Sequence, residues 1–205
     1  MADLMTIEAV LSIFKNGIDL IKELYPSKTE DRIGALEREM KRLGDNFHKG
    51  LVLENDDGYN LFVRILRRTI ENGTKERIRR FARIAHDVFY TENVSIARGG
   101  LYVDLIDRLT DQEVAFLLLL VKHWEGTDGK KTITQPTSEG MYEEEVIAVF
   151  EKIGIAKVEW GPVIKKLEVV GIFQFENSYV VGGRIYGLSE FGQAFVGFLK
   201  DESHT

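Results

Sequence analysis

The sequence predicts a mainly α-helical chain of 205 residues that ends in a small α+β module with an antiparallel sheet. Two observations carry this prediction. Apolar residues recur at spacings of three and four through most of the chain, as they do along the buried face of a helix. After residue 171 the pattern changes to short apolar runs at 172–176, 179–181 and 184–186, separated by Asn-Ser and Gly-Gly pairs. Such runs between turn residues are typical of paired strands.

A heptad pattern predicts two helices in the first fifty residues. The first carries an apolar seam at Leu4, Ile7, Leu11, Phe14, Ile18, Ile21 and Tyr25. Pro26 ends that helix, and a capping box of Ser27 and Glu30 begins the next. The second helix continues the pattern at Ile33, Leu36, Met40, Leu43 and Phe47. Two interpretations stay open: a helical hairpin that packs on its own domain, or a seam that pairs with a second chain to form a homodimer.

Three more helices follow a polar loop at residues 54–58. Residues 57–90 predict a basic hairpin that turns at Asn72-Gly73, with Thr74 as the cap of its second helix. A fifth helix is expected over residues 101–109, and Gly99-Gly100 before it is either a turn or a loose helix start. We therefore expect a helical region over residues 1–109, made of the heptad-patterned hairpin 1–50 and the basic hairpin 57–90.

A second region is expected at residues 110–205. Thr110 and Glu113 form a capping box that opens a helix over 111–124, apolar on nearly every side and therefore buried. Residues 125–140 predict either a domain boundary or a long loop. Helices are expected at 143–153 and 162–170, with Pro162 in the favoured first turn, and Ser189 caps a last helix.

The order helix, turn, short helix, strands and closing helix resembles a winged helix-turn-helix domain. The segment 165–173 (KKLEVVGIF) is similar to a recognition helix entering the wing, and 186–195 (YGLSEFGQAF) resembles the strand exit of such domains. The resemblance implies a helix that enters the major groove of double-stranded DNA. The candidate nucleic-acid contacts are then Lys157, Lys165, Lys166 and Arg184. Domains of this fold also serve in protein docking, so both roles stay open.

The composition of the predicted recognition helix disfavours base reading. Residues 162–170 contain no Arg, Asn, Gln, Ser or Thr, which are the side chains that usually contact base edges. Residues 141–205 hold ten acidic and six basic residues, a net charge of −4. This balance favours a regulatory or interaction protein that contacts protein as well as, or instead of, DNA.

Positive charge concentrates instead at residues 64–83. The candidate partner-binding residues there are Arg64, Arg67, Arg68, Arg77, Arg79, Arg80 and Arg83. Guanidinium groups suit an acidic protein partner, but they also pair with acidic residues of the same chain such as Asp104, Asp107 and Asp111. The segments 77–85 (RIRRFARIA) and 105–113 (LIDRLTDQE) resemble helical phage-defence proteins of the abortive-infection alpha type. That likeness implies an adaptor that binds an acidic partner.

Other classes of protein receive little support from the sequence. No cysteine is present, the four histidines are scattered, and no nucleophile elbow or phosphate-binding loop occurs. We therefore expect a non-enzymatic protein with no cofactor and no metal. The net charge of −6 disfavours purely electrostatic DNA binding. The longest apolar run has eight residues, so we expect no membrane span and a cytoplasmic location.

Overall fold

Helices make up most of the part of the chain that the structure describes, together with one two-stranded and one three-stranded antiparallel sheet. The predicted fold class is thereby confirmed. The structure is a computed structural model that describes residues 4–24, 29–44, 47–125, 132–136, 142, 144–176 and 183–200. The chain divides into two compact units, Met1–Leu109 (unit 1) and Thr110–Thr205 (unit 2). Among the described residues, no helix has both the length and the apolar character needed to cross a membrane.

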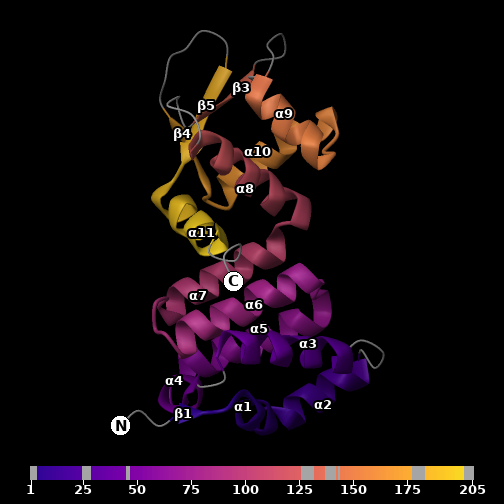
Figure 1. The fold of residues 1–205 in the computed structure, drawn as a ribbon, viewed down its shortest axis with the longest axis vertical. Helices are drawn as coiled ribbons and strands as arrows, with labels where there is room; N and C mark the ends of the chain where they lie inside the picture. The colour runs from indigo at the N-terminus through magenta and orange to yellow at the C-terminus, as the bar shows by residue number, and fades with distance from the viewer. Residues whose placement is uncertain are drawn as a thin grey trace. The chain divides into compact units, whose positions relative to one another are not determined.

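Unit 1 is a helical assembly with two very short strands. Its elements are β1 (Leu4–Met5), α1 (Ile7–Ile13), α2 (Lys15–Leu24), α3 (Thr29–Leu43), β2 (Phe47–His48), α4 (Lys49–Leu53), α5 (Asp56–Asn72), α6 (Lys75–Phe89) and α7 (Ile96–Arg108). Helices α3, α5, α6 and α7 lie side by side and enclose the core (Figure 1). The predicted cap of α6 is present: the Thr74 hydroxyl accepts a hydrogen bond from the Arg77 backbone N–H.

The prediction of one continuous first helix is wrong. Thr6 caps α1, which begins only at Ile7, and a separate helix α2 begins at Lys15. Leu4 instead pairs with His48 in the β1–β2 ladder, and α1 ends at Phe14. The Phe14 ring lies 5.0 Å from that of Phe62 on α5, centroid to centroid. The seam residues Ile7 and Phe14 are thus buried within unit 1, while pairing of the seam with a second chain stays a prediction. The predicted cap Ser27 lies outside the described residues.

Of the two expectations for Gly99 and Gly100, the helix start is the one observed: both lie near the beginning of α7 and are buried. A Cβ atom at position 99 would lie 2.6 Å from Cγ2 of Val88 on α6 and 3.1 Å from Cδ2 of Leu61 on α5. Glycine is therefore required here for the close approach of three helices. The predicted loop at 54–58 is also shorter than expected, since Asn55 caps α5 through the Gly58 N–H at 2.9 Å.

Unit 2 contains a three-stranded sheet and four longer helices among its described residues. Its elements are α8 (Asp111–Glu125), β3 (Thr132–Pro136), α9 (Glu144–Ile153), the 3₁₀ turn η1 (Lys157–Glu159), α10 (Trp160–Val169), β4 (Phe173–Glu176), β5 (Gly183–Leu188) and α11 (Glu190–Lys200). The strand order is β3-β5-β4, and both ladders are antiparallel. Strand β3 lies within the segment expected as a linker or loop, so that expectation missed a strand. The strand expected at 179–181 lies outside the described residues.

The core of unit 2 is aromatic and fixes the position of α10. The Phe150 ring stacks on Phe116 of α8 and on Trp160 of α10, with centroid distances of 4.2 and 4.9 Å. The Trp160 indole N–H donates to the Ile155 carbonyl at 2.9 Å. Gly171, with a φ of +79°, ends the turn after α10, a conformation that strains any other residue.

Candidate functional site

The sequence analysis placed four candidate DNA contacts in unit 2, and the structure puts three of them on one helical segment. Lys157 lies on η1, and Lys165 and Lys166 lie on α10, which follows η1 without a break. Arg184 lies on β5, opposite Gln135 of β3. The two neighbouring lysines of α10 have different surroundings, so they are described separately.

Lys166 binds within unit 2. Its Nζ donates to both carboxylate oxygens of Glu113 on α8, at 2.8 and 2.7 Å. The Glu113 side chain is only 10% exposed. Its Oε2 also accepts the Thr110 backbone N–H at 2.7 Å, while the Thr110 hydroxyl accepts the Glu113 N–H. Lys166 therefore joins α10 to the capping box of α8, and its charge is compensated by the nearly buried carboxylate.

Lys165 faces solvent but is also paired. Its Nζ lies 2.6 Å from Oε2 of Glu168, one turn further along α10. An exposed pair of this kind contributes little to stability, but it does neutralise the local field. Lys157 is exposed. Two residues further on, the Glu159 carboxylate accepts a hydrogen bond from the Ala156 backbone N–H.

The outer side of the η1–α10 segment exposes two valines beside Lys165, a feature that was not expected from the sequence. Val158 is 83% exposed and Val169 is 72% exposed. Together with the exposed Pro162 and Lys165 they follow a spacing of four, three and four, which places them on one side of a helix. This spacing is the sequence signal that could have revealed the exposed surface. The same helix also carries a second stripe of apolar residues, Trp160, Val163, Ile164 and Leu167, and only the burial of their side chains distinguishes the two stripes. We call Val158, Pro162, Lys165 and Val169 the α10 surface.

The arginines of residues 64–83 in unit 1 are largely paired with acids of the same unit. The ion pairs join Arg64 to Asp104, Arg67 and Arg68 to Glu71, Arg68 to Asp107, Arg79 to Glu39, and Arg83 to Asp87, with N···O distances of 2.7–3.3 Å. These pairs realise the internal pairing that the sequence analysis left open.

The remaining two arginines of this set have partly or largely buried positions. Arg77 donates from Nη2 to the Leu109 carbonyl at 2.8 Å, close to the end of unit 1. Arg80 is only 7% exposed. The set therefore does not form a continuous exposed cationic face, and its binding of an acidic partner stays a prediction.

His86, a histidine of unit 1, lies beside an acidic side chain. His86 Nδ1 lies 3.0 Å from Asp87 Oδ1, and that carboxylate is shared with Arg83. No group of three or more His, Asp or Glu side chains among the described residues is placed to hold a metal ion. In unit 2, the α10 surface combines exposed valines with a charged residue and is the candidate site.

Comparison of the chain with models of protein families, with curated proteins and with solved structures finds no significant match.

Proposed function

We propose that unit 2 is a winged-helix domain, and that the chain is a non-enzymatic interaction protein whose α10 surface binds protein, in the first place a second copy of the chain. The order of elements supports the domain assignment. Helices α9 and α10 follow α8, and the antiparallel strands β4 and β5 and the closing helix α11 come after them. The segments 165–173 and 186–195, which carry the resemblance, coincide with the α10–β4 junction and with the exit from β5 into α11.

The charges of α10 favour protein over DNA as the partner. A helix that enters the major groove needs cations for phosphates and polar side chains for base edges. Here Lys165 is paired with Glu168 and Lys166 with Glu113. The segment offers no amide, hydroxyl or guanidinium group for a base edge. Approach of DNA would require these pairs to open, which offsets the gain from phosphate contacts.

The single observation that carries the proposal is the exposure of Val158 and Val169 on one side of the same segment. Burial of a valine side chain contributes about 1.5–3 kcal/mol. Two such residues, with Pro162 between them, provide the apolar centre that protein interfaces need and DNA-binding helices do not.

A second copy is the partner that the charge balance fits best. The segment 157–169 carries three lysines and two glutamates, and one of these lysines, Lys166, is compensated by Glu113 of α8. The remaining two lysines and two glutamates cancel. Two identical surfaces of zero net charge can meet about a two-fold axis without mutual repulsion, which is compatible with the self-complementary contact of an isologous dimer.

The test is the mass of the full-length chain in solution, measured by sedimentation equilibrium over a range of concentrations. We expect a reversible dimer of twice 23.4 kDa for the wild type and a monomer for the double variant Val158→Asp/Val169→Asp. The control is Leu101→Asp, because Leu101 is an exposed apolar residue of unit 1, at 53% exposure. This variant should remain dimeric.

The DNA alternative is tested on the same proteins. Fluorescence anisotropy with a mixed-sequence duplex, at about 50 and 200 mM salt, reports binding through phosphates as a loss of affinity between the two salts. A monomeric wild type that binds this duplex, and loses binding on Lys157→Glu/Lys165→Glu, would overturn the proposal in favour of DNA. A dimer that survives both valine substitutions would place the interface elsewhere.

A further inference from the structure

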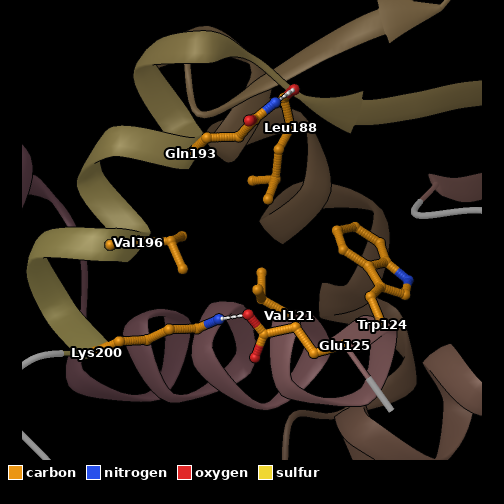
Figure 2. A pocket seen from close by; sticks show the side chains of 8 residues that line it. Val121, Trp124, Glu125, Leu188, Gln193, Val196 and Lys200 are labelled. Carbon is orange, nitrogen blue, oxygen red and sulfur yellow. Dashed lines mark hydrogen bonds and ion pairs between the residues drawn. The ribbon is translucent and has the colours of Figure 1, made fainter. Parts of the chain in front are cut away.

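A cavity of about 450 Å³ lies inside unit 2 between α8, the end of β5 and α11. Val121, Leu188 and Val196 point into it from these three elements, and the indole of Trp124 forms one side (Figure 2). Its volume lies in the range of small-molecule sites, which are mostly apolar with a few polar groups that fix orientation. The α10 surface does not contribute to it.

Polar groups lie at the two ends of this cavity. At one end Lys200 of α11 pairs with Glu125 of α8. At the other end, the side-chain Nε2 of Gln193 donates a hydrogen bond to the Leu188 backbone carbonyl (Figure 2). The side chains of Val121, Leu188 and Val196, which lie between these ends, are apolar. The cavity is therefore suited to a ligand with a long apolar body and one charged end.

We propose that this cavity binds an apolar monocarboxylate, with the ligand carboxylate on Nζ of Lys200 and its hydrocarbon body against Val121, Trp124 and Val196. The inference is independent of the proposed function, because it uses no residue of the α10 surface.

The sign of the ligand charge follows from the exposure of the two partners in the ion pair. The Glu125 side chain is 57% exposed, whereas the Lys200 side chain is 29% exposed. A ligand carboxylate can displace Glu125 from Lys200 at small cost, because the displaced carboxylate is solvated again by water. An ammonium ligand would instead have to displace the more buried Lys200 from its partner. An anionic ligand is therefore favoured over a cationic one.

Gly197 gives a way to fill the cavity without strain. This residue lines the cavity from α11, and a Cβ atom built on it meets no atom within 4 Å. Gly197→Leu should therefore occupy the space of the ligand body while α11 keeps its packing. Gly197→Ala adds only one methyl group to the same position and serves as the matched control.

The experiment is a calorimetric titration of the full-length protein with decanoate, compared with decanol and decylamine. We expect saturable 1:1 binding of decanoate and at least tenfold weaker binding of the other two compounds. Lys200→Gln should weaken decanoate binding about tenfold, because a charge-assisted hydrogen bond is lost. Glu125→Gln should strengthen binding, because it removes the competing carboxylate. Gly197→Leu should abolish binding, and Gly197→Ala should retain it.

Three results would overturn the proposal: no saturable binding of decanoate to the wild type, equal affinity for decanol, or unchanged affinity in both Lys200→Gln and Gly197→Leu. Circular dichroism confirms that each variant is folded. If Gly197→Leu fails to fold, unchanged affinity for decanoate in Lys200→Gln alone overturns the proposal. The double variant Val158→Asp/Val169→Asp should bind decanoate like the wild type, which separates this site from the proposed dimer interface.

Discussion

Glu113 Oε2 receives the Lys166 ammonium at 2.7 Å and, at the same distance, the backbone N–H of Thr110. One carboxylate oxygen therefore takes part in the N-terminal capping of α8 and also binds α10 through Lys166. Because α10 carries the proposed interface, the pair couples the start of unit 2 to the orientation of that surface. A residue that the resemblance assigns to DNA contact thus has a structural role.

Lys166→Met should lower the free energy of unfolding by about 1–3 kcal/mol, because it leaves the nearly buried Glu113 carboxylate without its cation. Lys165→Met should change it by less than about 0.5 kcal/mol, since that lysine is exposed. Urea denaturation followed by circular dichroism measures both. Equal effects of the two substitutions would show that the Lys166–Glu113 pair has no special role.

Gly99→Ala should destabilise unit 1 although alanine favours helices, because its Cβ would lie 2.6 Å from Val88. We expect a cost of about 1–3 kcal/mol from overpacking. Gly197→Ala, in the open part of α11, should instead stabilise the protein by up to about 1 kcal/mol. The thermal midpoints of the two variants should move in opposite directions. A rise in both would mean that α7 can shift away from α6.

Phe14→Ala should cost about 3–5 kcal/mol, because this buried ring packs on Phe62 and Tyr59. Ile13→Ala is the control at a half-exposed neighbour and should cost little. Charged substitutions at Leu11 and Phe14 are therefore expected to unfold unit 1. If these charged variants are folded monomers whereas the wild type is a dimer, the N-terminal seam is the dimer interface.

Glu39 should make part of the stability of unit 1 depend on pH. Partial burial works to raise the pKa of this carboxyl, but hydrogen bonds from Arg42 and Arg79 outweigh burial and hold the pKa below its ordinary value of 4.5. The ionised Glu39 carboxylate, paired with Arg42 and Arg79, stabilises the folded state above pH 4.5. This contribution is lost as the pH falls through the lowered pKa of Glu39.

Arg79→Ala should therefore cost up to about 1 kcal/mol at pH 7 and progressively less as the pH falls below 4.5. Urea titrations at a series of pH values measure this difference. In a Glu39→Gln background the same substitution should have a small effect that is independent of pH. A cost of Arg79→Ala that stays constant down to low pH would show that Glu39 is not its relevant partner.

Local patterns were sufficient for most elements. The capping box of Thr110 and Glu113 predicted the start of α8, Thr74 predicted the start of α6, and Gly171 predicted the end of α10. Each signal lies within a few residues of the boundary that it sets, because caps and turns satisfy backbone groups locally. The mainly α fold class followed from these signals together with the apolar periodicity.

Only the tertiary structure decided which apolar and charged residues remain at the surface. The break of the first helix, the strand β3 and the close approach at Gly99 all depend on partners distant in the sequence, such as β2, β5 and Val88. Both stripes of the η1–α10 segment contain apolar residues, and the one that contains Trp160 is buried, with Trp160 stacked on Phe150. The sequence alone thus determined the helices and their ends, whereas long-range packing selected Val158 and Val169 for the surface, because burial depends on partners that no local pattern records.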